Sequence, residues 1–265
     1  MIPPHTILGD FAKGGFAELK LVELAGRRRA LLRRPLHFSI FKLGEYRRFK
    51  SGIAIRSLLT PNKNIVGSIE YGYDFLHPWE LIELVNGDNL KTHFNNRSSV
   101  LSTNLEYILE SCASGVARVH DAGLMHLDVK PENFIFQNVG TPVVKLTDFD
   151  LTKPEDANAP SPQMGTPSYM APEQLRSKCA YKASDVFAFS VMAYMFFTGK
   201  MPFKGSTQKS SLKRQASENY EAPLVRDSVP DVPDRWNLAI ARGLSKKLEH
   251  RFPDINAMLD FIHSR

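Results

Sequence analysis

The stretch that decides the fold reads HLDVKPEN and covers His126–Asn133. Two further segments follow it along the chain, Asp148-Phe149-Asp150 and then GTPSYMAPE at residues 165–173. Between the first two segments, Asn133–Phe136 and Val143–Leu146 are short, β-branched and aromatic runs that predict a hairpin. The hairpin folds the first two segments back toward one another.

Three oxygen donors, Asp128, Asn133 and Asp148, lie on the loops that bracket this hairpin. Such hard ligands suit Mg²⁺, which takes one or two carboxylates together with substrate phosphates. Lys130 is a cation two residues from Asp128 and suits a phosphate in transfer. Any one of these residues could be a solvated turn residue, but the ordered set indicates a phosphate-transfer site.

These segments resemble the protein kinase family, and the resemblance runs through nearly the whole chain. The family's catalytic loop H-R-D-x-K-x-x-N and its Mg²⁺-binding D-F-G are matched by residues 126–133 and 148–150. Its A-P-E is matched by Ala171-Pro172-Glu173. The family's buried helix Asp is matched by Asp185, and the late Arg that pairs with the A-P-E Glu by Arg251.

The resemblance implies a role for each matched residue of the catalytic loop and its surroundings. Asp128 would accept or orient the proton of the substrate hydroxyl, and Asn133 and Asp148 would hold Mg²⁺ across the ATP phosphates. Lys130 would stabilise the γ-phosphate as charge spreads in the transition state. A Lys at this position and G-T-P-x-Y before A-P-E are typical of the Ser/Thr branch. Lys130 and Thr166 match both, so Thr166 is grouped with the catalytic residues.

The same resemblance implies where ATP would bind. The backbone of Glu83-Leu84-Val85 would hold adenine, with Ile82 as gatekeeper. Further cofactor contacts are expected from Gly14, Gly15, Leu19, Arg33 and Ile135. The Gly-rich loop of the family is only partly kept, because residues 12–17 retain one of its three glycines. Alanine can still line a phosphate-binding turn where φ is negative, so the loop is weakened without ATP being excluded.

The strand lysine of the family is missing. In Ala30-Leu31-Leu32-Arg33-Arg34 the literal A-x-K spacing selects Leu32, and a slip of one residue selects Arg33. The two alternatives point to opposite faces of the strand. We favour Arg33, which keeps the charge but not the compact ammonium. Leu32 stays open, as does the reading in which Arg33 and Arg34 are simply exposed.

The helix glutamate that would pair with that lysine is missing as well. Alignment on the family's helix puts Gly52 at its position, and Glu45, two turns earlier, is expected to be exposed. Two other departures concern the loops. Leu127 replaces the Arg that binds an activation-loop phosphate, so control by loop phosphorylation is not expected. Asp150 replaces the Gly of D-F-G, and we expect a surface or turn-capping role for it rather than a metal contact.

The resemblance implies an α+β, bilobal protein kinase fold over residues 1–265. A small N-lobe with an antiparallel sheet would cover residues 1–85, and a larger helical C-lobe residues 86–265. The patterning agrees, because strand-like runs precede residue 86 and helical periodicity follows it. The expected N-lobe elements are strands at Phe16–Leu24, Arg29–Arg34, Ile65–Tyr71 and Trp79–Leu84, and a helix at Leu43–Leu59. The expected C-lobe helices are Asn104–Ala122, Lys182–Thr198, Trp236–Leu244 and Ile255–Ser264.

Composition and charge indicate which other classes of protein the chain does not belong to. The chain of 265 residues is 43% hydrophobic and carries two cysteines, which excludes wholesale disorder and a disulfide framework and favours a reducing compartment. The longest apolar stretch, Val186–Phe197, is too short to span a bilayer, so no membrane contact and a cytoplasmic location are expected. The net charge is +6, and residues 1–85 carry 13 Lys and Arg against 8 Asp and Glu. No recognition motif supports a nucleic-acid partner.

The sequence thus predicts an atypical Ser/Thr protein kinase that transfers the γ-phosphate of ATP to protein hydroxyls with Mg²⁺. Its partners would be ATP and a protein substrate with a Ser or Thr acceptor. The missing Lys–Glu pair and the thinned Gly-rich loop motivate one alternative, a pseudokinase that acts as a nucleotide-binding or scaffolding module.

Overall fold

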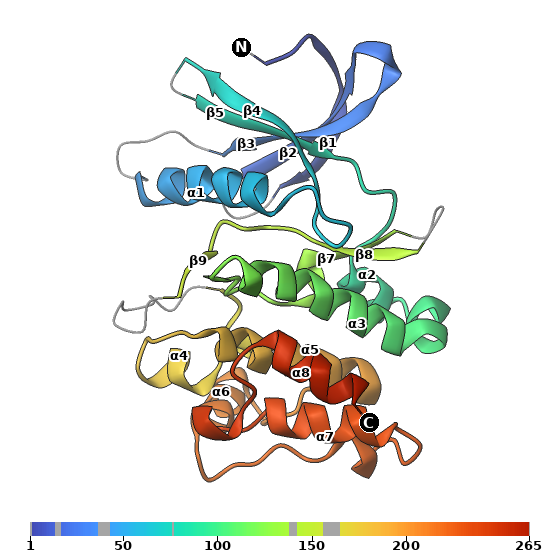
Figure 1. Ribbon diagram of the computed structural model, residues 1–265, viewed down its shortest axis with the longest axis vertical. Coiled ribbons are helices and arrows are strands. Elements are labelled where there is room, and N and C mark those ends of the chain that lie inside the picture. Colours follow the sequence, from blue (N-terminus) through green and yellow to red (C-terminus); the bar gives the residue numbers. More distant parts are fainter. Residues whose placement is uncertain are drawn as a thin grey trace.

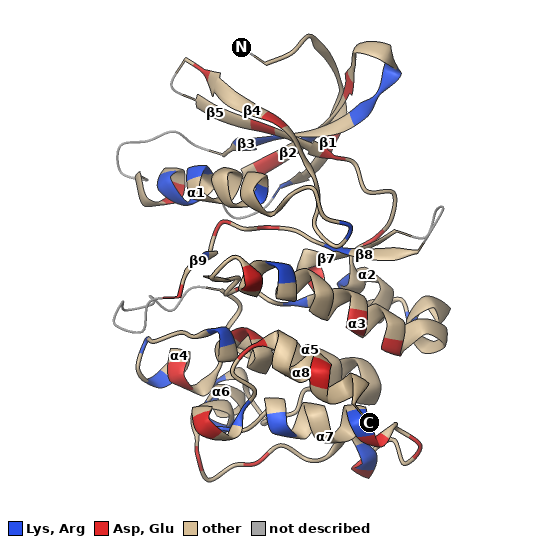
Figure 2. Cartoon of the chain, viewed as in Figure 1, with Lys and Arg blue, Asp and Glu red and all other residues tan. Residues whose placement is uncertain are grey.

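The chain folds into a small lobe built on a sheet and a larger lobe built on helices (Figure 1). The computed structural model describes residues 2–13, 17–36, 43–75, 77–137, 142–155 and 165–264. The predicted α+β, two-lobed architecture is confirmed. Acidic and basic residues are interspersed over both lobes (Figure 2).

The small lobe carries a five-stranded sheet in the order β1-β2-β3-β5-β4, with every neighbouring pair antiparallel. Its strands are β1 (His5–Lys13), β2 (Ala17–Leu24), β3 (Arg29–Pro35), β4 (Ser68–Asp74) and β5 (His77–Glu83). One helix, α1 (Leu43–Leu59), lies below the sheet in the view of Figure 1 and has the bounds that the sequence predicts. Strand β1 was not predicted.

The two faces of this sheet bury different sets of side chains. On one face, Leu32 packs with Val22, Trp79 and Leu81. Successive residues of a strand point to opposite faces, so Leu31 lies on the other side, where it packs with a set that includes Ile135 of the large lobe. Arg33 shares the face of Leu31. Of the two open alternatives on β3, Arg33 and not Leu32 therefore lies toward the junction of the lobes.

The large lobe consists mainly of helices around one hydrophobic core. Its helices are α2 (Leu90–Asn95), α3 (Ser99–Asp121), α4 (Pro172–Arg176), α5 (Lys182–Thr198), α6 (Gln208–Ala216), α7 (Asp234–Gly243) and α8 (Ile255–His263). The central helix α5 is buried along most of its length and has the predicted bounds. It ends because Gly199, with φ of 71°, adopts the left-handed conformation and donates its N–H to Met195.

Short strands join the lobes and shape the loops of the site. The predicted hairpin forms from β7 (Phe134–Gln137) and β8 (Val143–Leu146), while β6 (Leu124–Met125) pairs with β9 (Lys153–Pro154). Leu146 also forms a parallel bridge with Ile65, which ties the hairpin to the segment that leads into β4. The catalytic-loop residues 126–133 thus run between β6 and β7.

The structure also differs from the sequence-based prediction in detail. The segment between β5 and α2 ends in Asn89, whose side-chain oxygen accepts from the N–H of Thr92 and so caps α2. Helices α2, α4 and α6 were not predicted. Throughout the described ranges, no helix has the length and apolarity needed to cross a membrane.

Candidate active site

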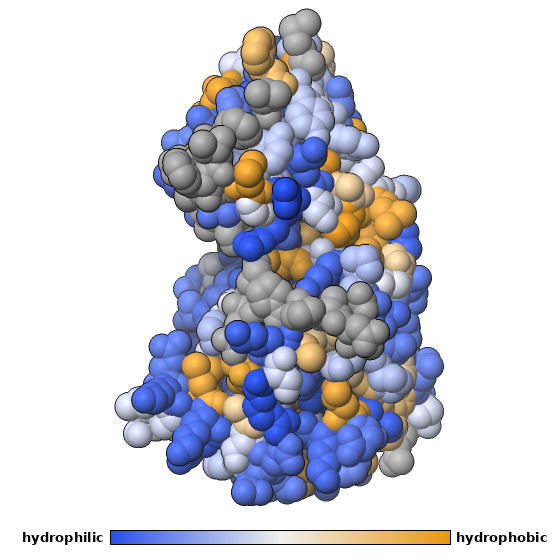
Figure 3. Space-filling view, turned by 90° about the vertical axis from the view of Figure 1, so that its left-hand side faces the viewer, coloured by the Kyte–Doolittle hydropathy of each residue, from blue (hydrophilic) through white to orange (hydrophobic). Residues whose placement is uncertain are grey.

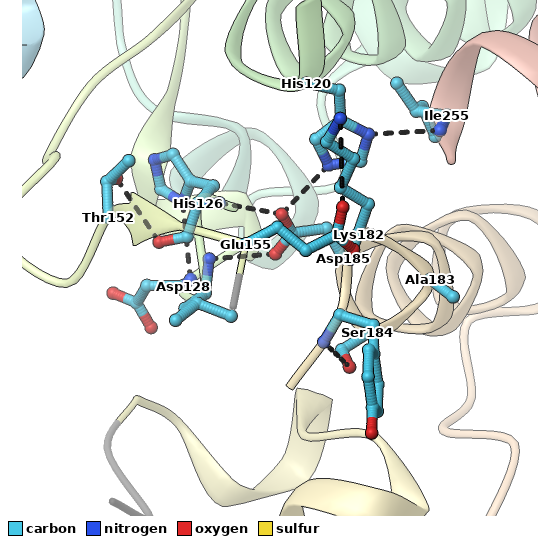
Figure 4. Close-up of polar contacts among 12 residues, drawn as sticks. His120, His126, Asp128, Thr152, Glu155, Lys182, Ala183, Ser184, Asp185 and Ile255 are labelled. Atoms are coloured by element: carbon cyan, nitrogen blue, oxygen red, sulfur yellow. Dashed lines mark hydrogen bonds and ion pairs between the residues drawn. The ribbon is translucent and has the colours of Figure 1, made fainter. Parts of the chain in front are cut away.

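The catalytic loop begins with a strained backbone that helix α5 holds in place. Leu127 has φ of 65°, in the left-handed region that a branched residue adopts only when its surroundings enforce it. The carboxylate of Asp185 accepts from the N–H of His126 at 2.7 Å and from the N–H of Leu127 at 2.8 Å. His120 Nε2 lies 3.0 Å from the same carboxylate (Figure 4). Asp185 therefore fixes the backbone that precedes Asp128.

The three residues predicted to be catalytic meet at one point. Lys130 Nζ lies 2.7 Å from Asp128 Oδ2 and donates to Thr166 Oγ1 at 3.1 Å. Asp128 is 8% exposed, and its second oxygen, Oδ1, is buried without a hydrogen-bond partner among the described residues. Gly165, with φ of 111°, passes close by, and a Cβ there would lie 3.4 Å from this oxygen. An unpartnered buried carboxylate oxygen is costly unless a ligand supplies a donor.

The two predicted metal ligands lie on either side of the β7–β8 hairpin. Asn133 uses its side-chain amide to donate to Asp128 Oδ2 at 2.9 Å and to the carbonyl of Asp128 at 2.8 Å. The carbonyl of Asn133 in turn accepts from Thr147, the residue before Asp148. Asp148 is half-buried and has φ of 63°. The hairpin thus returns Asp148 to the side of Asn133, as the sequence predicts.

Apolar residues from both lobes form a cluster at the junction between the lobes. Leu31, Val66, Ile82 and Val85 are buried there, with Leu19, Leu21, Leu84 and Ile135 packed against them. Three of the predicted cofactor contacts, Leu19, Val85 and Ile135, thus belong to one cluster that draws on both lobes. The outline of the molecule is indented where the lobes meet (Figure 3). Gly14 and Gly15 lie outside the described residues.

The side chain of Glu83 is committed to other contacts. Its carboxylate accepts from the N–H of Gly67 at 2.6 Å and pairs with Lys145 at 2.7 Å. The predicted role of this segment concerns its backbone, which these side-chain contacts leave unchanged. They fix β5 to the β7–β8 hairpin at the point where the chain passes from one lobe to the other.

Arg33 is buried in a network of charges. Its guanidinium contacts the carboxylate of Asp150 and lies 3.4 Å from Glu80 Oε2. Glu80 Oε1 lies 3.0 Å from Nε of Arg56, on helix α1. Burial by itself lowers the pKa of Arg33, but the carboxylates of Asp150, Glu80 and Asp148 outweigh it and raise that pKa. Arg33 therefore stays charged.

Two sequence-based expectations about this network are wrong. Asp150 is only 4% exposed and pairs with Arg33, so it is neither a surface residue nor a simple turn cap. The reading of Arg33 as an exposed residue fails for the same reason, since it is 5% exposed. The charged head of Arg56 is buried beside Glu80. Glu80 was not singled out, although a carboxylate inside the apolar run 78–82 was a usable signal.

Other residues of the matched motifs hold the large lobe together. Glu173 pairs with Arg251 at 2.8 Å and accepts from Ser184 at 2.7 Å. Gln215 of α6 donates to the carbonyls of Pro167 and Met170, which supports the backbone next to Thr166. Sequence reasoning did not find Gln215, because nothing in its local pattern separates it from a solvated helix residue.

Fold, catalytic loop and supporting ion pairs together define a protein kinase domain. The family model described as "Protein kinase domain" matches residues 42–253, and the chain belongs to this family. It is 31% identical to the serine/threonine-protein kinase PknL of Mycobacterium tuberculosis over 202 residues, which cover 74% of this chain and 49% of the relative. It is 25% identical to the probable serine/threonine-protein kinase PknB of Lactococcus lactis over 261 residues, covering 96% and 41%.

A third relative, the serine/threonine-protein kinase PrkC of Bacillus subtilis, is 27% identical over 253 residues, which cover 94% of this chain and 38% of the relative. The chain thus spans half or less of the length of these curated relatives.

Proposed function

We propose that the chain is a Ser/Thr protein kinase that transfers the γ-phosphate of ATP to hydroxyl groups of protein substrates with Mg²⁺. The observation that carries the proposal is the cluster of Asp128, Lys130 and Thr166, in which one oxygen of Asp128 has no donor among the residues that the structure describes. A substrate hydroxyl could supply that donor. Asp128 would then orient the hydroxyl and draw its proton as the oxygen attacks.

The donor set of the site fits Mg²⁺ and a triphosphate. Asn133 spends its amide N–H groups on Asp128, so its side-chain oxygen is the atom left for a cation, and Asp148 adds a carboxylate. Two oxygen ligands of this kind leave room for phosphates and water around Mg²⁺. When bound, Mg-ATP supplies the phosphoryl group and neutralises its charge. Lys130 would stabilise negative charge on that group, and its contact with Thr166 holds it in place.

The apolar cluster at the lobe junction suits a purine ring. Leu19, Val85 and Ile135 would enclose adenine, with the backbone of Glu83 and Val85 at its edge. Gly14 and Gly15 are proposed to approach the phosphates. Arg33 would lie where the phosphates bind, beside Asp148. The carboxylate of Asp148 is close enough to Arg33 to raise the pKa of the Arg33 guanidinium.

Three further observations support the proposed acceptor class and the proposed location. Lys130 and Thr166, the two residues that match the pattern of the Ser/Thr branch, are in contact and join the catalytic loop to the segment before A-P-E. The relatives described above are named Ser/Thr protein kinases, which supports the same class. Both cysteines, Cys112 and Cys179, are free, which agrees with the reducing conditions of the cytoplasm.

Single-turnover transfer from labelled ATP tests this proposal. The native chain should label itself or a generic protein substrate only with Mg²⁺ present, and Asp128→Asn should lower the rate by about 100-fold or more. Asp260→Asn, an exposed change on α8, is the matched control and should transfer at the native rate. Labelling that is equally fast in Asp128→Asn would refute the proposal that this site catalyses the transfer. A Tm raised by Mg-ATP without any transfer would instead identify a nucleotide-binding pseudokinase.

A further inference from the structure

Four charged side chains from four elements meet in the interior beside the catalytic site. Arg33 comes from β3, Glu80 from β5, Arg56 from α1 and Asp150 from the turn after β8. None is more than 5% exposed, and two cations balance two carboxylates. Buried charges of this kind are tolerated only when each finds a partner. Each of the four has one here, so the loss of any member leaves another uncompensated.

Helix α1 passes close to the turn at Gly52. A Cβ built on Gly52 would lie 2.2 Å from Asp150 Oδ1 and 3.3 Å from the backbone nitrogen of Asp150. Gly52 lies inside a regular helix, where glycine is a poor choice for conformational reasons. Glycine fits at position 52 because it has no side chain that would collide with Asp150. The carboxylate of Asp150 occupies the volume that any other side chain at position 52 would fill.

We propose that Asp150 supplies the counter-ion of the strand cation Arg33 in place of a carboxylate on helix α1, and that this pair positions Asp148 for Mg²⁺. The inference rests on the proposed function, because it concerns the same site. Arg33 and Asp150 join strand β3 directly to the Asp148-Phe149-Asp150 turn. Asp150 is thus a positioning residue that acts through its neighbour two residues earlier.

Helix α1 is attached to the site by separate contacts. Arg56 pairs with Glu80, donates to the carbonyl of Val66 at 3.2 Å and reaches Thr147 Oγ1 at 3.4 Å. Its guanidinium also lies over the ring of Phe149, 5.0 Å from the ring centre. These contacts hold the carboxyl-terminal half of α1. At the Arg33–Asp150 pair the helix supplies the ring of Phe49, whose centre lies 4.4 Å from the Arg33 guanidinium, and the empty space at Gly52. Asp150 therefore takes its counter-ion from the sheet, while α1 contributes Arg56, which lies over Phe149 of the same turn.

Moving the carboxylate from the turn to the helix tests the proposal. Three variants are compared with the native chain: Asp150→Gly, Gly52→Glu, and the two changes together. Asp150→Gly removes a partner of Arg33 and should weaken Mg-ATP binding about tenfold and slow single-turnover transfer by at least as much. Gly52→Glu alone should lower Tm, because two carboxylates then compete for one volume. The double variant should restore Mg-ATP affinity to within about threefold of native.

A matched control shows whether the location of the new carboxylate matters. Gly44→Glu places the same residue at an exposed position of the same helix, where no atom crowds a Cβ. Combined with Asp150→Gly, it should give no recovery. The proposal fails if Asp150→Gly binds Mg-ATP and transfers phosphate as the native chain does. It also fails if Gly52→Glu recovers no more than Gly44→Glu.

A stability cycle keeps the inference separate from catalytic activity. Gly52→Ala should lower Tm in the native chain, because its Cβ meets the carboxylate of Asp150, and should lower Tm clearly less in Asp150→Gly, where the carboxylate is gone and only backbone atoms of residue 150 remain close. The same shift in both backgrounds would refute the contact. If the native chain binds nucleotide but transfers no phosphate, the proposed function fails. In that case, the stability cycle and the Mg-ATP affinities still test whether Asp150 pairs with Arg33 beside Gly52.

Discussion

Replacing Asp185 by asparagine tests how the catalytic loop is held. The carboxylate of Asp185 is buried at 1% exposure and accepts from the backbone N–H of His126 and of Leu127. Asparagine has nearly the same shape but only one acceptor oxygen. In Asp185→Asn, one of the two backbone N–H groups therefore faces an NH₂ group and loses its acceptor.

The magnitude follows from these contacts. A buried donor left unsatisfied costs about 1–3 kcal/mol, and a hydrogen bond to a charged acceptor contributes about 1.5–3 kcal/mol. We expect the free energy of unfolding to fall by about 3 kcal/mol, a large share of the roughly 5–15 kcal/mol of a typical domain. For a chain of this size, that corresponds to a Tm lower by roughly 6–12 °C. Leu127, in its strained left-handed conformation, is the residue expected to relax first.

Urea unfolding followed by circular dichroism measures the effect, with Asp260→Asn as the exposed control. Single-turnover transfer, measured well below the new Tm, then reports whether Asp128 has lost its position. Stability and transfer equal to those of the control would refute this account of the loop. A stability loss with a native transfer rate would show that Leu127 keeps its conformation without both hydrogen bonds.

Two further predictions concern the large lobe. Glu173→Ala should lower the free energy of unfolding by about 3–5 kcal/mol, because Arg251 is left buried without its carboxylate. Denaturant unfolding measures this loss, and adding Arg251→Met should recover part of it; no recovery would argue against the pair. Burial, with Arg176 and Arg251 nearby, lowers the pKa of Lys246 from 10.5 to about 7. Between these values the folded chain binds fewer protons than the unfolded chain, so the free energy of unfolding should rise with pH from about 7 to about 10.5. Lys246→Met should lack this rise, and parallel pH dependences of the two chains would contradict the shift.

Elements with strong periodicity or complete burial could be predicted from the sequence. The bounds of α1 and α5 agree with the prediction. Helix α5 is apolar along most of its length, and α1 buries apolar residues from Phe49 to Leu59. Helix α6 was missed because Gln208–Ala216 is polar and buries only Gln215. Strand β1 was missed because two irregularities in its pairing with β2 interrupt the alternation that identifies a strand.

The site was predictable where its residues are close in sequence and not where they are distant. Asp128, Lys130 and Asn133 lie within one loop, so their spacing carries the information. Arg33 pairs with Asp150, 117 residues later, and with Glu80, 47 residues later. No local pattern shows such partners. The alternation of a strand predicts that Arg33 and Leu32 point to opposite faces of the sheet, but only the folded chain shows which of the two faces the junction of the lobes.

The contact between Gly52 and Asp150 also limits how this chain can change through successive single substitutions. Each residue is tolerated because of the other: the aspartate needs the empty position, and the glycine is useful only beside the aspartate. A first step at position 150 leaves Arg33 short of a partner, and a first step at position 52 crowds the carboxylate. Both routes to a helix-borne carboxylate pass through a less stable chain, so the two positions constrain each other.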